Sequence, residues 1–174
     1  MERIDRIIHH PLFVEHMEAN RVAEQDRIFC KHDLEHLLNV ARIGRIMMAE
    51  ENYQVELPLY YGAALLHDIG RHLQYKKGIP HEVASAQIAP FILEECGFTA
   101  EEIQRIVEAI KGHRGEKKAS GQDCFPSAEA YCAESKTMAE LLYRADKASR
   151  ACYACAAKDK CNWDDAKKNQ SLKY

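Results

Sequence analysis

Several kinds of sequence feature are missing from this chain, and each absence excludes a class of protein. No run of about 18 apolar residues occurs, so we expect no membrane span. The opening residues, MERIDRIIHHP, mix both charge signs and hold no long apolar segment, which argues against a signal peptide. Alternating β-branched residues, internal repeats and low-complexity tracts are also lacking. We therefore expect a single cytoplasmic all-α domain spanning residues 1–174.

An excess of charge of either sign is lacking too. The formal net charge is −3, and no basic block stands out beyond the short KGHRGEKK at 111–118, which is typical of a solvated loop. The balance gives no reason to expect a nucleic-acid polymer as a partner. No glycine-rich phosphate loop is present either.

Proline and glycine divide the chain into helical pieces. The expected helices cover about 2–28 with an interruption at Pro11, then 30–51, 58–70, 80–97, 99–112 and 127–157, the last with a break near 134–136. The stretch TAEE, from Thr99 to Glu102, is typical of a capping box. Residues 114–126 are polar and contain Gly and Pro, which predicts a loop.

Histidines and one aspartate fall on apolar helix stripes. His32 and His36 follow the same three-and-four spacing as the apolar residues around them, and His113 extends another such stripe. Asp146 lies among apolar neighbours in a later helix, and a buried charge must be paired or bound to a metal. A single such histidine is usually a hydrogen-bonded core residue. Their recurrence on separate helices favours a set of metal ligands.

The stretch LLHDIGRHL, residues 65–73, places His67 and Asp68 side by side at the end of an apolar helix. Neither residue helps to bury a core, and neither is a strong helix former. Adjacent residues at a helix end can point two ligands into one site. We expect Gly70 to let the chain turn away after them.

Taken in order, these motifs resemble the HD superfamily of metal-dependent phosphohydrolases. The motifs are HLLNVAR around His36, LLHDIGR around His67 and Asp68, HEVASA at His81, AIKGHR at His113 and YRADKASR at Asp146. They cover about residues 30–150 and leave 151–174 as a cysteine-containing tail. Within the superfamily the chain looks most similar to the symmetrical diadenosine tetraphosphate hydrolases, which also carry a histidine just after the HD pair, here His72.

The resemblance implies a helical bundle that holds two divalent transition metals, with Fe, Mn, Co, Ni and Zn all open as their identity. One metal would be held by His36, His67, Asp68 and Asp146. The second would be held by His81 and His113, with Asp68 bridging. In such sites a metal-activated water attacks phosphorus, and Asp68 would also orient that water as the catalytic residue.

The implied substrate is a small phosphate ester or anhydride, with a dinucleoside polyphosphate as the best guess. Candidate phosphate contacts are His32, His72, Arg71, Lys111, Arg114 and Lys147, of which the four cations are also explained as surface charges. A nucleotide phosphatase or a cyclic-nucleotide phosphodiesterase would use the same ligands. A non-catalytic sensor that binds a nucleotide or a metal is a further alternative. The oligomeric state stays open.

Seven cysteines are an odd number, and cytosolic thiols stay reduced, so a disulfide framework is not expected. Cys152, Cys155 and Cys161 have a C-x2-C-x5-C spacing that supplies three ligands of a tetrahedral site. If the helices bearing His36 and Asp146 run antiparallel, Cys30 is a candidate fourth ligand. The hypothesis is a second site for zinc or an iron–sulfur cluster, which could make the tail a redox-responsive module. The alternative is reduced cysteines packed as small apolar residues, as we expect for Cys96, Cys124 and Cys132.

Overall fold

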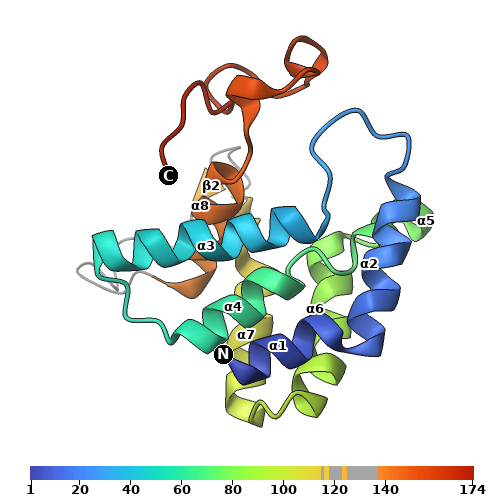
Figure 1. Ribbon diagram of the computed structural model, residues 1–174, viewed down its shortest axis with the longest axis vertical. Coiled ribbons are helices and arrows are strands. Elements are labelled where there is room, and N and C mark those ends of the chain that lie inside the picture. Colours follow the sequence, from blue (N-terminus) through green and yellow to red (C-terminus); the bar gives the residue numbers. More distant parts are fainter. Residues whose placement is uncertain (115, 118–122, 125–136) are drawn as a thin grey trace.

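The computed structural model describes residues 1–114, 116–117, 123–124 and 137–174 (Figure 1). Its α-helices are α1 (Glu2–His9), α2 (Pro11–Ala23), α3 (Leu34–Glu51), α4 (Leu57–Leu66), α5 (Arg71–Lys77), α6 (His81–Glu95), α7 (Ala100–Gly112) and α8 (Met138–Ala148). Two residues of β1 (Glu116–Lys117) pair antiparallel with β2 (Asp123–Cys124). The all-α prediction is confirmed, and none of the helices in the described part of the chain is long and apolar enough to cross a membrane.

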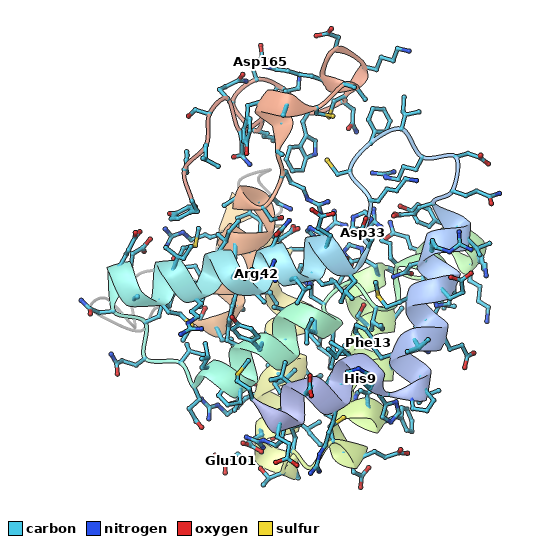
Figure 2. The ribbon with its side chains drawn as sticks, in the orientation of Figure 1. His9, Phe13, Asp33, Arg42, Glu101 and Asp165 are labelled. Atoms are coloured by element: carbon cyan, nitrogen blue, oxygen red, sulfur yellow. The ribbon has the colours of Figure 1, made fainter. Side chains whose placement is uncertain are left out.

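Side-chain caps set several helix starts. Asp33 lies at the start of α3 (Figure 2). Its carboxylate accepts a hydrogen bond from the backbone N–H of His36, so α3 begins at Leu34 rather than at Cys30. The predicted capping box is confirmed, because Thr99 and Glu102 each accept a hydrogen bond from the other's backbone N–H.

Other predicted helix boundaries are also wrong. Helix α2 ends at Ala23, whereas the sequence predicted helix to about residue 28. The helix after Pro58 ends at Leu66, and the sequence did not predict the short helix α5 that follows. The helix predicted to end at Ala157 ends at Ala148, while its first part, 127–136, lies outside the described residues. The side-chain amide of Asn169 donates to the carbonyls of Lys147 (2.8 Å) and Arg150 (2.7 Å), so the returning tail satisfies the end of α8. Beyond it the chain forms two 3-10 helices, at Cys152–Ala154 and Lys158–Lys160.

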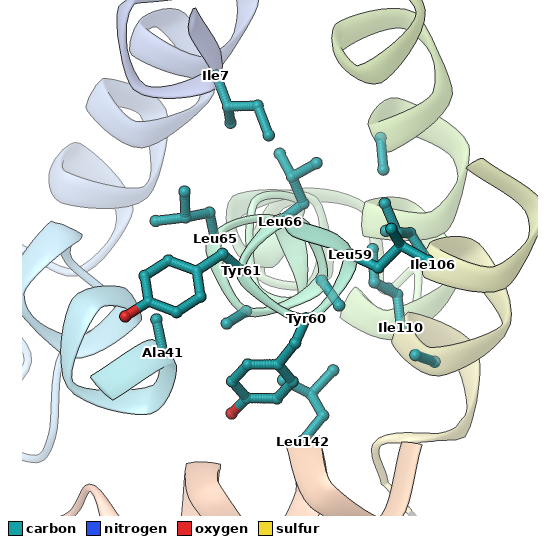
Figure 3. Close-up of a cluster of buried hydrophobic side chains, with 14 of the residues drawn as sticks. Ile7, Ala41, Leu59, Tyr60, Tyr61, Leu65, Leu66, Ile106, Ile110 and Leu142 are labelled. Carbon is teal, nitrogen blue, oxygen red and sulfur yellow. The ribbon is translucent and has the colours of Figure 1, made fainter. Parts of the chain in front are cut away.

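Helix α4 forms the centre of the core. Its residues 59–66 are all buried, as expected for an apolar run that is surrounded on every side. Figure 3 shows this helix end on, with Ile7, Ala41, Ile106 and Leu142 approaching it from four other helices. The tight packing fixes the direction of α4, and therefore the position of the two residues that follow it.

Gly70 serves close packing rather than an unusual turn. Its φ of −89° is open to any residue, which corrects the expectation that glycine is needed for turning. A Cβ at this position would lie 2.7 Å from the Cβ of Ala84 and 2.7 Å from the backbone nitrogen of Ser85. The backbone N–H of Gly70 donates to the Ser85 hydroxyl at 3.0 Å. The missing side chain therefore lets α6 approach the HD pair.

Candidate metal centre

Five separate segments bring six buried ligand-type side chains together. His36 lies in the first turn of α3, His67 and Asp68 follow α4, and His81 opens α6. His113 caps the C-terminus of α7, and Asp146 lies in the last turn of α8. The exposed fraction of each residue is 6% or less. The site is created by helix ends that packing within the chain brings together, and not by any one motif.

The ligand atoms form two groups that share one residue. The first group is His36, His67, Asp68 and Asp146, and the second is Asp68, His81 and His113. Within each group the ligand atoms all lie within 4.8 Å of one another. These are the six residues that the sequence suggested as metal ligands, in the same division between two positions.

Asp68 faces the two groups with different oxygens. Its Oδ2 lies 3.2 Å from Nε2 of His67 and 3.6 Å from Nε2 of His36. Its Oδ1 lies 3.3 Å from Nε2 of His81. Asp146 belongs to the first group alone, with Oδ1 3.3 Å from Nε2 of His36. A carboxylate whose two oxygens face different ligand groups is suited to contact two cations at once.

Backbone carbonyls fix two of the imidazoles. Nδ1 of His67 donates to the carbonyl of Ala64 at 2.8 Å, and Nδ1 of His113 donates to the carbonyl of Ile110 at 2.5 Å. A carbonyl can only accept a hydrogen bond, so the proton lies on Nδ1 in both rings. When the ring is neutral, its Nε2 presents a lone pair to the site, as a metal ligand requires.

Side chains hold the other two histidines. Nδ1 of His81 lies 2.7 Å from Oε1 of Gln74 and also 2.7 Å from Nη1 of Arg71. Ligation through Nε2 requires the proton on Nδ1, which makes Gln74 the acceptor. The hydroxyl of Ser149 lies 3.2 Å from Nδ1 of His36. The histidines of the site thus have an outer layer of supporting groups.

Two atoms inside the site test whether these residues fit a cation. Nε2 of His67 and Oδ1 of Asp68 are buried without a hydrogen-bond partner among the described residues. Leaving buried polar atoms unsatisfied costs free energy, and a divalent cation would satisfy both atoms. Imidazole nitrogen and carboxylate oxygen together suit a divalent transition metal. The residues present therefore fit metal ions at this position.

Burial and neighbouring charges set the protonation of the site. Burial lowers the pKa of His81 to about 3 and that of His113 to about 4, so both rings are neutral at pH 7. Burial acts to raise the pKa of Asp68, but the charge of His67 and nearby imidazoles hold it well below its usual range. The carboxylate is therefore ionised, which is the state that binds metal.

His32 enters the site with a partner that the sequence did not reveal. Its Nε2 lies 3.8 Å from Oδ2 of Asp68, and its Nδ1 lies 2.5 Å from Oε1 of Glu24. Glu24 is buried and also accepts from the backbone of His32 and from the hydroxyl of Tyr75. Despite burial, these hydrogen bonds lower the pKa of Glu24 to about 2. Glu24 is followed by the polar residues Gln25 and Asp26 and gave no sequence signal of burial.

Arg150 is a second residue that sequence reasoning missed. Its Nη2 donates to Oδ1 of Asp146 at 2.9 Å and lies 3.1 Å from Nε2 of His36. The guanidinium is buried and compensates the carboxylate charge. Its place one helical turn after Asp146 is the signal that could have found it.

A cavity of about 990 Å³ opens over the metal centre. Its walls include Asp68, His81, His113 and Asp146 together with four of the residues suggested as phosphate contacts: His32, Arg71, Arg114 and Lys147. The ammonium of Lys147 lies 2.9 Å from Oδ2 of Asp146. Lys111 is exposed and is not among the residues that line this cavity.

His72 has a different place from the one expected. It is buried, it does not line the cavity, and its Nε2 lies 2.9 Å from Nδ1 of His16. Its backbone N–H donates to Asn20, whose side-chain amide donates to the carbonyl of Asp68. The structure thus gives His72 a packing role between α2 and α5 where the sequence suggested a phosphate contact.

The cysteines do not form a compact ligand group. In the described part of the chain, no set of three ligand atoms within 4.8 Å of one another includes a cysteine. Cys30 and Cys155 nevertheless line one cavity of about 320 Å³ between the loop before α3 and the tail, whereas Cys152 and Cys161 do not line it. The site at Cys30, Cys152, Cys155 and Cys161 stays a prediction, and it would require the tail to close further on this loop.

Comparisons with known proteins show the family and the fold of the chain. The HD domain family model matches residues 33–151, so the chain belongs to the HD domain family. An uncharacterized protein of Clostridium beijerinckii is 39% identical over the full length of both chains. The crystal structure of a predicted HD superfamily hydrolase from an uncultured Thermotogales bacterium shares the fold, with a TM-score of 0.57 and 21% identity. That match covers 89% of this chain and 80% of the other.

Proposed function

We propose that this protein is a two-metal phosphohydrolase that cleaves an ester or anhydride bond in a small, nucleotide-like phosphate. The observation that carries the proposal is the position of the Asp68 carboxylate. Its Oδ2 faces one group of buried ligand-type residues, and its Oδ1 faces the other. The solved relative is itself described as a predicted HD superfamily hydrolase, which supports a hydrolytic reaction.

The ligands would hold the two metals in their observed division, with Asp68 between them. Bound divalent metals lower the pKa of a water and neutralise charge on phosphoryl oxygens. Asp68 would orient that water through its carboxylate. Glu24 fixes the ring of His32 and holds its Nε2 beside Asp68, where a protonated His32 ring would donate a hydrogen bond to a phosphoryl oxygen.

The charge of the cavity supports an anionic substrate. Its described lining contains the cations Arg71, Arg114, Arg144, Lys147, Arg150, Lys167 and Lys173, against the acids Asp68, Glu82 and Asp146. Arg144 and Arg150 are committed to ion pairs with Glu51 and Asp146. Lys147 and Lys167 also form ion pairs, with Asp146 and Asp164. Arg71, Arg114 and Lys173 form no ion pair among the described residues and can oppose the charge that develops on a phosphoryl group.

Dinucleoside polyphosphate remains our best single substrate, on the strength of the motif resemblance. A nucleotide phosphatase or a cyclic-nucleotide phosphodiesterase would need the same ligands and is separated only by its products. A sensor without activity is less well supported, because all six expected ligand positions carry a buried His or Asp. An open cavity that reaches those ligands is what substrate turnover requires.

A hydrolysis screen tests the proposal. The protein, supplied with Mn²⁺ or Fe²⁺, is incubated with diadenosine polyphosphates, nucleoside mono-, di- and triphosphates and cyclic nucleotides, and the products are separated by chromatography. We expect cleavage that is lost in Asp68→Ala and kept in Asp26→Ala, a matched change on the exposed surface. Two ADP from diadenosine tetraphosphate would support the best guess. If the protein holds two metals and cleaves nothing on the panel, the proposal that it hydrolyses nucleotides is overturned.

A further inference from the structure

The tail, residues 151–174, builds one wall of the cavity over the metal centre. Almost all of it lies beyond the family match at 33–151. In Figure 1 it is the orange-to-red segment after α8, and Figure 2 places Asp165 at its outer edge. The tail nevertheless supplies Trp163, Ala166, Lys167, Asn169, Lys173 and Tyr174 to the same cavity that contains the metal ligands.

Specific hydrogen bonds hold this wall in place. The side-chain amide of Asn169 donates to the carbonyls of Lys147 and Arg150, at 2.8 and 2.7 Å. Within the tail, the Lys158 ammonium donates to Gln170 at 2.8 Å, and Gln170 donates to the carbonyl of Asp165 at 3.1 Å. The wall is thereby fixed to the last turn of the helix that carries the ligand Asp146.

An aromatic and cationic cluster lies where the wall meets that helix. The ammonium of Lys147 lies 5.5 Å from the centre of the Trp163 ring and 5.2 Å from the centre of the Tyr143 ring. The same ammonium is 2.9 Å from Oδ2 of Asp146. One lysine thus separates two half-buried aromatic rings from a metal ligand, and all four residues line the cavity.

This layout matches the two ends of a nucleotide. A phosphate chain needs cations and the metal centre, whereas a base needs a flat aromatic surface on which to stack. A phosphate that drew the Lys147 ammonium away from the rings would free the indole for the base. Lys167 and Lys173 add positive charge on the same wall.

We propose that the tail is the specificity element of this site, and that Trp163 stacks on the base of a nucleotide whose phosphates reach the metal centre past Lys147. The inference rests on the proposed function, because it assigns the phosphate end of the ligand to that centre. The inference goes beyond the proposed function because it assigns recognition of the base to a segment that lies almost entirely outside the family match.

Binding of two probes to the full-length, Mn²⁺-loaded protein tests the inference. ADP and inorganic pyrophosphate both present a diphosphate to the metal centre, with up to three negative charges on ADP and four on pyrophosphate, but ADP alone has a base. We expect ADP to bind about tenfold more tightly than pyrophosphate in isothermal titration, as typical stacking strengths imply. Trp163→Ala should remove this preference and leave pyrophosphate binding unchanged, while Trp163→Phe should keep most of it.

A matched control is available in the same segment. Tyr153 is an exposed tail aromatic that does not line the cavity, so Tyr153→Ala should keep the ADP preference. An ADP preference that survives Trp163→Ala, or no preference in the unaltered protein, would overturn the role of Trp163 while leaving the hydrolase standing. Absence of pyrophosphate binding from the unaltered protein would instead contradict the phosphate-binding metal centre.

Discussion

The helical core and the tail position their cavity residues by different means. In the core, ligands lie at the ends of helices whose buried faces pack around α4, and backbone carbonyls orient the His67 and His113 rings. In the tail, short 3-10 helices carry few buried residues, and the anchor is the side chain of Asn169. The core therefore holds its cavity residues by helix packing and backbone hydrogen bonds, whereas the tail depends on a few side-chain contacts.

A severe loss is expected even when the ligand that is removed, Asp146, belongs to one metal group only. Asp146→Ala should lower the rate of hydrolysis by more than about a hundredfold. Mutating even a residue that only hydrogen-bonds to a metal ligand typically lowers metal affinity or activity by about 10–100-fold. A chelator should abolish activity in the unaltered protein, and Mn²⁺ should restore it there but not in the variant. Steady-state assays with the best substrate of the screen measure both effects. Activity that resists the chelator would contradict a metal-dependent reaction.

The core can also be disturbed without touching a ligand. Gly70→Ala places a methyl group against Ala84 and the backbone of Ser85, and overpacking of this kind costs about 1–3 kcal/mol. We expect a lower melting temperature and weaker metal binding, because α6 must move away from Asp68. Thermal unfolding with and without metal measures the change. A variant as stable as the parent would show that the close approach is not needed.

The tail should respond differently. Asn169→Ala removes the anchor, so we expect a several-fold rise in KM for the nucleotide substrate with little change in melting temperature. Limited proteolysis should cut the variant after Ala151 faster than the parent. A large loss of global stability would mean that the tail is part of the core.

The smallest expected effect concerns pH. Burial, followed by the charge of His16 and Lys76, lowers the pKa of His72 from 6.5 to about 4. Between these values the unfolded chain binds the proton and the folded chain does not, so the stability from this group falls as pH falls from about 6.5 to 4. The double change His16→Gln and His72→Gln should flatten that slope in denaturant titrations, whereas His9→Gln on the exposed surface should not. An unchanged slope in the double variant would exclude the pair as its source.

Helical spacing and motif order predicted which residues the fold brings together at the candidate metal centre, because His36 and Asp146 follow the same stripes as the apolar residues around them. The same reasoning could not show the partners. Glu24 is contributed by the far end of α2, and its burial depends on contacts with His32 and Tyr75. The early end of α8 also escaped prediction, because the residue that caps it, Asn169, lies far along the chain. Local sequence patterns predict which face of a helix is buried. Contacts between residues far apart in the sequence become known only from the folded structure.

The count of bound metal ions per chain tests the shared carboxylate most directly. Inductively coupled plasma mass spectrometry on metal-loaded, desalted protein should find two ions at the His/Asp centre, one in His113→Ala, one in Asp146→Ala and none retained in Asp68→Ala, with Asp26→Ala matching the unaltered protein. The Asp68 variant is decisive, because only a residue common to both groups should empty both positions. A variant of Asp68 that still retains one tightly bound ion would contradict the bridging role.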